Sequence, residues 1–300
     1  MKATFAVLFV AGLALGAASA RAQSEPPVEL TGTLAKARAS GAVTIAHRES
    51  SIPFSYLNAR KEPIGYSIEL CKLLVEAMGA SVGKELEVKW LPVTSATRIE
   101  AITSGKADIE CGSTTNDIER RKLVSFSPTI FVSGTKLMVK RGSPIKSFRD
   151  LAGKTVVVTA GTTNEKAMQE ITKRFKIAFR LVVSPDHAHS FMQVVEGKAD
   201  AFATDDVLLY GLIALNVAQK DFEVIGEFLS YDPYGVMYRK GDAQMERLVN
   251  ETFHALAEDG EIERQYKRWF LRKLPSGASI DLPMSPQLET LIRTMATKPD

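Results

Sequence analysis

Cysteine and histidine are scarce in this chain, which has two cysteines and four histidines among 300 residues. A metal site needs more of these ligands close together than such a sequence supplies, so we expect none. A large excess of charge of one sign is lacking too, since the formal net charge is only +3. A nucleic-acid partner would require a basic surplus on one face. The Gly-x-Gly-x-x-Gly pattern of dinucleotide sites is absent. We therefore expect neither a nucleic-acid partner nor a cofactor.

Long hydrophobic runs are lacking outside the N-terminus, so no later segment has the length of a membrane span. Lys2 precedes an apolar run over residues 3–18, and Ala20-Arg21-Ala22 then offers a small-x-small cleavage site. This pattern is typical of a secretory signal peptide. We predict a signal peptide over residues 1–22 and an exported mature chain that begins near Gln23.

The cysteines, Cys71 and Cys111, form an even set in a chain that we expect to be exported. Secreted proteins fold in an oxidising compartment, which favours a disulfide between them. Closing a loop of this length would contribute roughly 4 kcal/mol. The alternative is a pair of buried free thiols, because Cys71 lies on the apolar face of a predicted helix.

Strand-like and helix-like segments alternate along the mature chain, and this alternation predicts mostly parallel sheets with helices on both faces. The expected strands are 43–47, 86–90, 107–111, 155–159, 180–183 and 201–204. The expected helices are 64–78, 95–104, 163–175 and 187–196, followed by helical sequence from 243 to 270 and a short helix near 287–295.

Two further segments, 135–140 and 234–238, are extended and rich in β-branched or aromatic residues. We predict that they are strands crossing between two lobes, because two crossings make a hinge. The expected architecture is a two-lobed α/β fold. Its first lobe comprises residues 23–135 and 234–300, and its second lobe comprises residues 136–233.

An internal repeat supports two equivalent lobes. Gly105-Lys-Ala-Asp108 and Gly197-Lys-Ala-Asp200 each follow a predicted helix and open a predicted strand. A four-residue match alone is weak, but the flanking polar residues also agree in spacing. Ten residues before each Gly stand Ser95 and His187, and five residues after each Asp stand Ser113 and Asp205. Ligands of open α/β sheets bind at strand carboxyl ends and helix N-termini, so these positions predict two halves of one cleft.

The densest polar segment is Gly112–Arg120, which places three hydroxyls before a predicted helix. Ser113 and Thr115 with the backbone amides suit an anion, and Arg120 can pair with a carboxylate. The alternative is a capped helix with a solvated arginine. In the second lobe Gly161-Thr162-Thr163 follows a strand in the same way, and there the alternative is an ordinary helix cap.

Three more charged positions are candidates. Asp205 and Asp206 are adjacent at a strand end, and we assign the helix cap to Asp206 and an ammonium partner to Asp205. Arg48 ends the first strand. Arg98 lies in the first turn of a helix, where a cation opposes the helix dipole, and such local violations often mark functional residues. The alternative for both arginines is plain surface exposure.

The sequence resembles a known family. His47–Ser55, Gly65–Ser67, Glu110–Asn116 and Thr129–Phe131 are similar to segments of the periplasmic glutamate/aspartate-binding proteins of ABC transporters. The ending Gly260–Phe270 is similar to the wider family 3 of solute-binding proteins. The resemblance covers essentially the whole mature chain and implies the fold of type II periplasmic binding proteins.

The resemblance also implies a function and a set of binding residues. The protein would be a periplasmic monomer that binds L-glutamate or L-aspartate and delivers it to an ABC transporter permease. Arg120 with Ser113, Thr115 and Thr163 would hold the ligand's α-carboxylate, and Asp205 its α-ammonium. The side-chain carboxylate would be bound by Arg48, Ser95, Arg98 and His187. The preference between glutamate and aspartate stays open, because one methylene is worth only about 1–3 kcal/mol.

Enzymatic alternatives use the same fold or a short motif. Cyclohexadienyl and arogenate dehydratases are similar in fold, but a lyase needs a free general acid. Asp205 is assigned to an ammonium group here, and Glu110 precedes the polar loop. Ser133-Gly-Thr-Lys136 matches the Ser-x-x-Lys pattern of some hydrolases without its companion motifs. We expect a binding protein and not an enzyme.

Overall fold

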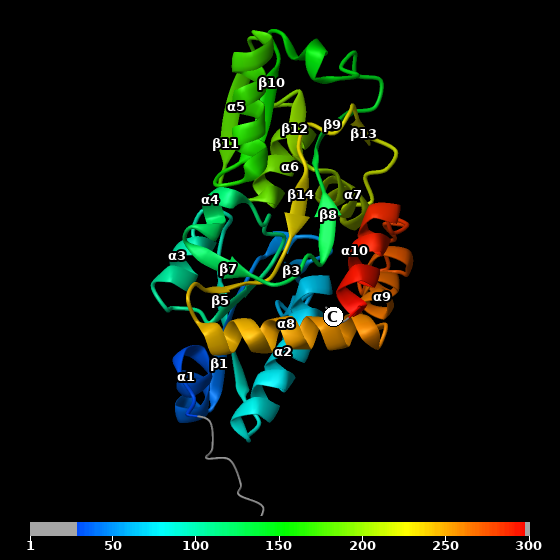
Figure 1. The fold of residues 1–300 in the computed structure, drawn as a ribbon. Helices are drawn as coiled ribbons and strands as arrows, with labels where there is room; N and C mark the ends of the chain where they lie inside the picture. Colours follow the sequence, from blue (N-terminus) through cyan, green and yellow to red (C-terminus); the bar gives the residue numbers. More distant parts are fainter. Residues whose placement is uncertain (1–28, 298–300) are drawn as a thin grey trace, which may run out of the picture.

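The computed structural model describes residues 29–297. The predicted signal peptide over residues 1–22 lies outside the described residues. Two groups of elements stack along the long axis of the molecule, as Figure 1 shows. Within residues 29–297 no helix has both the length and the apolar character of a membrane span.

The first sheet has five strands in the order β5-β1-β6-β15-β7. β1 (Ala42–His47) pairs in parallel with β5 (Glu87–Pro92) and β6 (Ile109–Cys111). β15 (Met237–Arg239) runs antiparallel to β6 and to β7 (Val124–Phe126). The helices of this half are α1 (Gly32–Ser40), α2 (Tyr66–Val82), α3 (Arg98–Thr103), α8 (Ala243–Glu258) and α9 (Glu261–Tyr266). We call these elements the first lobe.

Helices cover both faces of the first sheet because its inner strand β1 is apolar on both sides. Val43 and Ile45 of β1 belong to the core that includes side chains of α2 and α8. Ala46 belongs to a separate cluster with Ala101 and Ile102 of α3. The continuous burial of β1 is the pattern expected of a parallel strand enclosed between helices.

The second sheet repeats this arrangement in the order β11-β10-β12-β9-β13. β10 (Thr155–Thr159) pairs in parallel with β11 (Arg180–Ser184) and β12 (Ala201–Asp205). β9 (Thr135–Lys140) runs antiparallel to β12 and to β13 (Phe222–Ile225). The helices are α5 (Thr163–Phe175), α6 (His187–Val195) and α7 (Asp206–Leu215), and we call these elements the second lobe.

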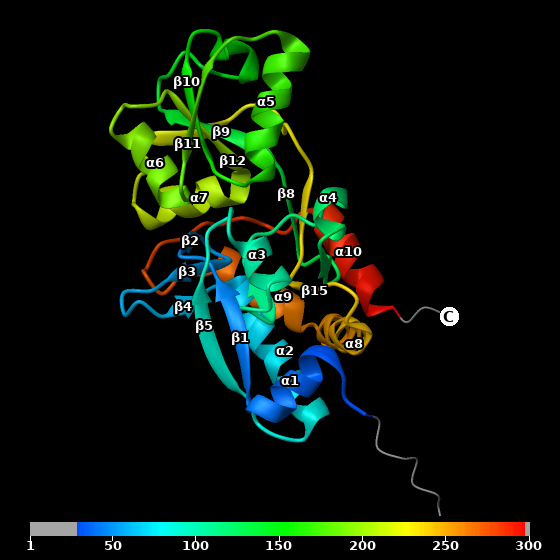
Figure 2. The same ribbon diagram turned by 90° about the vertical axis from the view of Figure 1, so that its left-hand side faces the viewer.

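Two strands connect the lobes. β8 (Phe131–Ser133) and β14 (Asp232–Tyr234) pair antiparallel between the two sheets, as Figures 1 and 2 show. The sequence predicted two crossing strands but placed them at 135–140 and 234–238. That placement was wrong by a few residues, because those segments are mostly β9 and β15, inner strands of the sheets. Their apolar, β-branched character reflects burial within a sheet rather than a crossing.

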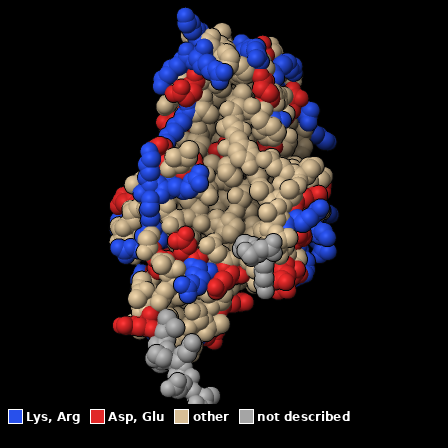
Figure 3. Space-filling view, in the orientation of Figure 1, with Lys and Arg blue, Asp and Glu red and all other residues tan. Residues whose placement is uncertain are grey.

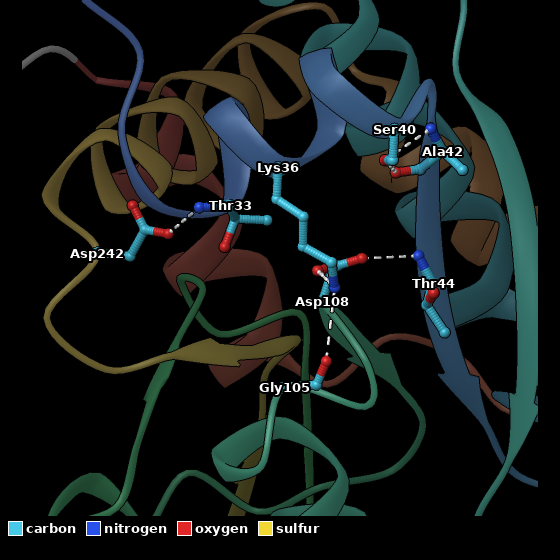
Figure 4. A network of polar contacts seen from close by, with 8 residues as sticks. All are labelled: Thr33, Lys36, Ser40, Ala42, Thr44, Gly105, Asp108 and Asp242. Atoms are coloured by element: carbon cyan, nitrogen blue, oxygen red, sulfur yellow. Dashed lines mark hydrogen bonds and ion pairs between the residues drawn. The ribbon is translucent and has the colours of Figure 1, made fainter.

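The Gly-Lys-Ala-Asp repeat has the same structural role in both lobes. The carboxylate of Asp108 accepts from the backbone N–H of Thr44 at 2.8 Å, and the Asp108 N–H donates to the Thr44 carbonyl. Asp200 forms the same pair of bonds with Thr155. Each aspartate thus fixes the start of one parallel strand, β6 or β12, against its neighbour, β1 or β10. Figure 4 shows this contact in the first lobe, where Lys36 also pairs with Asp108 at 2.7 Å.

Cys71 on α2 and Cys111 at the end of β6 form a disulfide, as predicted. The bridge ties a helix of the first lobe to the strand that leads into the polar loop. The remaining elements are three short strands, β2 (Ser50–Ser51), β3 (Ser55–Leu57) and β4 (Pro63–Ile64), and four helical segments, of which the first three are short. The helical segments are α4 (Ile118–Arg121), η1 (Phe148–Leu151), η2 (Lys267–Leu271) and α10 (Pro286–Ala296).

Candidate ligand-binding site

The carboxyl ends of the parallel strands of both lobes meet at one cleft. Ser113 follows β6 of the first lobe, and Asp205 ends β12 of the second. Gly161, after β10, touches the first lobe so closely that a Cβ there would lie 2.7 Å from the Cα of Ala96. Its φ of +72° also favours glycine. The lobes are therefore in contact across the cleft in this structure.

Three arginines converge inside the cleft. Arg48, Arg98 and Arg120 are only 1%, 2% and 6% exposed. Burial lowers the pKa of Arg48 to about 10, although the charge of Glu110 acts in the opposite direction. Burial, Arg120 and Arg48 together hold the pKa of Arg98 well below its usual value. Plain surface exposure, the alternative considered for Arg48 and Arg98, therefore does not hold, because both side chains are buried.

Two of these guanidinium groups have unused donors. Arg48 Nη1 and Arg98 Nε have no hydrogen-bond partner within residues 29–297. Arg120 is anchored instead: its Nη1 donates to the Thr115 carbonyl at 2.9 Å, and its Nη2 to the Gly161 carbonyl at 3.3 Å. Arg120 therefore links the lobes, whereas Arg48 and Arg98 present free donors. Free buried donors of this kind suit an anion.

The hydroxyls of the cleft fall into two groups. Ser95 Oγ and Ser113 Oγ are buried without a partner among the described residues. Thr115 Oγ1 donates to Asp232 at 3.0 Å and lies 3.3 Å from Thr163 Oγ1 of the second lobe. Thr115 and Thr163, which come from different lobes, are thus brought together.

The helix start predicted at Ser95 was wrong. α3 begins at Arg98, with Thr97 at the N-cap position. Thr94 and Thr97 form a local turn in which each backbone N–H donates to the hydroxyl of the other. These local hydrogen bonds compete with the helical pattern, so the helix begins at Arg98. Ser95 lies before the helix, faces inward and is 2% exposed.

Asp205 is the acid of the second lobe in the cleft. Asn164 donates to its Oδ1 at 2.8 Å, and the Tyr234 hydroxyl donates to its Oδ2. Burial and the nearby Asp232 raise the pKa of Asp205 to about 8. A buried carboxyl in this state gains from a cationic partner such as an ammonium group.

The assignment of the helix cap to Asp206 needs correction. α7 begins at Asp206 itself, so Asp205 occupies the N-cap position without a side-chain cap. Asp206 instead accepts from Ser133 Oγ at 2.7 Å and from the N–H of Val207 at 2.8 Å. It therefore binds the hinge strand β8, and this contact could not be read from a local helix pattern.

His187 begins α6, as predicted, with Asp186 as its cap. Its Nδ1 lies 2.9 Å from Thr159 Oγ1. Burial and the charges of Arg48 and Arg98 hold its pKa well below the usual value. His187 is thus a neutral group at the cationic end of the cleft. The sequence reasoning did not identify Asn164, Tyr234 or Asp232 as site residues, although they hold Asp205 and Thr115. Of the three, only Tyr234 was named, and then as part of a predicted crossing strand.

A small pocket of about 180 Å³ opens at the edge of the cleft. Arg48 and Thr94 of the first lobe and Asp186 and His189 of the second lobe are among its lining residues. Figure 3 shows lysines and arginines gathered at the upper end and along the left edge of one face, whereas the middle of that face, over β8 and β14, is largely uncharged.

The model of the bacterial extracellular solute-binding proteins, family 3, matches residues 43–272. The chain belongs to this family. A cleft between two α/β lobes, lined by buried charges, agrees with solute binding, and the resemblance inferred from the sequence is confirmed.

Curated relatives of this solute-binding protein have names that refer to acidic amino acids. An L-glutamate/L-aspartate-binding protein of Pseudomonas aeruginosa is 43% identical over 273 residues, which cover 90% of each chain. A glutamate/aspartate import solute-binding protein of Escherichia coli is 37% identical over 95% of this chain and 94% of its own length. These relatives are transport proteins, which favours the binding protein over the lyase alternative.

Solved structures agree in fold. An ancestral arginine-binding protein bound to glutamine has a TM-score of 0.70 at 27% identity, over 77% of this chain and 99% of that chain. An ancestral amino-acid-binding protein described as a precursor of cyclohexadienyl dehydratase has a TM-score of 0.69 at 30% identity, over 79% and 99%. The predicted two-lobed fold is confirmed.

Proposed function

We propose that this solute-binding protein captures an acidic amino acid, L-glutamate or L-aspartate, in the periplasm and delivers it to an ABC transporter permease. The observation that carries the proposal is the burial of three arginines, Arg48, Arg98 and Arg120, in the cleft where the buried Asp205 ends β12. The names of the relatives that are 37% and 43% identical point to the same ligands.

The charges of the cleft match those of the ligand. Three guanidinium groups and one aspartate complement two carboxylates and one ammonium. Arg120, Ser113, Thr115 and Thr163 are proposed to hold the α-carboxylate, and Asp205 the α-ammonium. The side-chain carboxylate is proposed to meet the four residues at the cationic end, Arg48, Ser95, Arg98 and His187. Buried pairs of this kind enforce specificity more than affinity, because desolvation offsets much of their attraction.

We further propose that the ligand binds one lobe and that the other closes over it through the hinge strands β8 and β14. The division into residues 23–135 with 234–300 and residues 136–233 stays a prediction, as do the monomeric state and cleavage after Ala22. Mass spectrometry of the mature N-terminus and light scattering of the purified protein test the last two.

Calorimetric titration of the mature protein with glutamate, aspartate and glutamine tests the ligand. Glutamine has no charge for Arg48 and Arg98, so it is expected to bind at least about 2 kcal/mol, or thirtyfold, more weakly than the better acidic ligand. Equal affinity for glutamine and glutamate would refute the proposal. Prephenate, added as a control substrate, is expected to remain unchanged.

A further inference from the structure

A glycine inside α7 of the second lobe lies against the backbone of the first lobe. A Cβ added to Gly211 would lie 2.4 Å from the carbonyl oxygen of Ile52. Ile52 follows β2 of the first lobe, and Figure 2 shows β2 opposite α7. Apart from proline, glycine is the least favourable residue in a helix interior. The contact between the lobes, rather than helix formation, therefore accounts for the glycine at this position.

The loop that carries Ile52 is held firmly within the first lobe. The N–H of Tyr66, at the start of α2, donates to the Pro53 carbonyl at 2.8 Å. Phe54 is fully buried, and its ring centroid lies 4.9 Å from that of Phe131 on the hinge strand β8. The loop is therefore fixed by hydrogen bonding and packing, and it lies close to the hinge.

α7 is held equally firmly within the second lobe. Leu209 and Leu212 are buried and belong to the same core cluster as Phe202 of β12. Non-bonded carbon and oxygen atoms in favourable contact lie about 3.5 Å apart, so a new Cβ on Gly211 would require the two lobes to separate there by roughly 1 Å. Because each partner is fixed in its own lobe, this separation is accommodated by rotation about the hinge. A small shift beside the hinge becomes larger at the cleft.

We propose that Gly211 is a positioning residue for ligand capture, whose missing side chain lets the lobes close far enough for both halves of the cleft to contact the ligand. The inference rests on the proposed function. Arg48 belongs to the same loop as Ile52, because its N–H donates to Ser55 Oγ at 2.8 Å. Asp205 directly precedes α7. The contact at Gly211 thus controls how closely these two proposed binding residues approach each other.

Gly211 differs from Gly161, the other glycine at which the lobes touch. Gly161 has a φ of +72°, so any replacement there combines backbone strain with a clash against the other lobe. Gly211 lies within a helix, whose backbone conformation accepts ordinary residues. Neither Gly211 nor Ile52 is among the residues proposed to bind the ligand. Replacement of Gly211 therefore tests closure without removing a ligand contact or straining the backbone.

Calorimetric titration of the wild-type mature protein and of Gly211→Ala with glutamate tests the inference. We expect Gly211→Ala to bind glutamate at least about tenfold more weakly, because the closed state becomes less accessible. The ligand enters the open protein in both cases, so stopped-flow kinetics should show the change mainly in the dissociation rate. The urea midpoint of the unliganded variant is expected to equal or exceed that of the wild type, because open lobes relieve the contact and alanine favours the helix.

Gly79→Ala is the matched control. Gly79 also lies inside a helix, α2, and a Cβ there would lie 3.0 Å from the carbonyl oxygen of Lys84 in the same lobe. This variant meets a neighbouring backbone without affecting the approach of the lobes, so its glutamate affinity and dissociation rate are expected to be unchanged. Gly211→Ser, with a slightly larger side chain, is expected to weaken binding at least as much as Gly211→Ala.

Unchanged glutamate affinity in Gly211→Ala would overturn the inference while leaving the proposed function intact. A urea midpoint below that of the wild type, or a variant that does not fold, would also overturn it. In that case the contact would belong to the fold of the open and closed protein alike. A wild-type protein that binds no acidic amino acid would instead refute the proposed function.

Discussion

Replacement of Arg48 by methionine tests the central physical argument. Buried positive charge destabilises the unliganded cleft, and the bound ligand removes this destabilisation. Arg48 is 1% exposed, and burial lowers its pKa from 12.5 to about 10. Because both the folded and the unfolded states carry this charge at pH 7, the difference corresponds to about 3 kcal/mol against the folded state. Methionine has a similar length without the charge.

We expect Arg48→Met to raise the free energy of unfolding of the unliganded protein, by up to about 3 kcal/mol. The same change removes the donor Nη1, which is proposed to bind the ligand's side-chain carboxylate. Loss of a buried charge-assisted contact should weaken glutamate binding by at least about 2 kcal/mol, or thirtyfold. Stability and affinity are therefore expected to change in opposite directions.

Urea denaturation of the ligand-free protein measures the first effect, and calorimetric titration with glutamate measures the second. Arg149→Met is the control, because Arg149 is 64% exposed and pairs with Glu227 at the surface. Its effect on stability is expected to stay within about 0.5 kcal/mol, with unchanged affinity. An Arg48→Met protein that is less stable than wild type by 1 kcal/mol or more, with normal glutamate affinity, would refute the reasoning.

Three further predictions follow from the cleft and the first lobe. Gly161→Ala is expected to weaken glutamate binding at least about tenfold in a titration, because the new Cβ meets the other lobe on closure. Gly153→Ala is the control, because Gly153 has the same φ of +72° but open space around it. This variant should lower the stability without changing the affinity. Reduction of Cys71–Cys111 should lower the free energy of unfolding by at most roughly 4 kcal/mol in urea and leave affinity largely unchanged. Since the folded-state pKa of Asp205 is raised to about 8, its contribution to unliganded stability is fully present below its unfolded pKa of about 4 and is lost progressively as pH rises from there to about 8, and saturating glutamate should abolish this loss in thermal melts.

The fold could be predicted from the sequence because its signals are periodic or repeated. β10 and α5 were predicted with their observed bounds, since an apolar β-branched run and a capped amphipathic helix are local patterns. The Gly-Lys-Ala-Asp repeat located two equivalent lobes, and the structure shows why it recurs: Asp108 and Asp200 each fix a strand start. A local pattern does not show to which sheet a strand belongs. The predicted crossing strand was therefore placed at β9, whereas the observed one is β8.

The site was predictable in part for the same reason. Residues at strand ends and helix starts, such as Ser113 and His187, can be located once the elements are known. Asp232 could not, because its role depends on a contact with Thr115, which lies 117 residues away in the sequence. Nothing in the local segment Tyr231–Tyr234 distinguishes a buried hinge carboxylate from a solvated turn.

The position of Asp205 explains how one cleft can both attract and select its ligand. A cleft with only Arg48, Arg98 and Arg120 would favour any dianion, because all three charges are buried and Arg48 and Arg98 have unused donors. The carboxyl group of Asp205 opposes this by requiring a cation at one defined point. A dicarboxylic acid without an amino group would leave the buried Asp205 without a cationic partner and would gain only the arginine contacts. Succinate should therefore bind more weakly than aspartate, which calorimetry can measure.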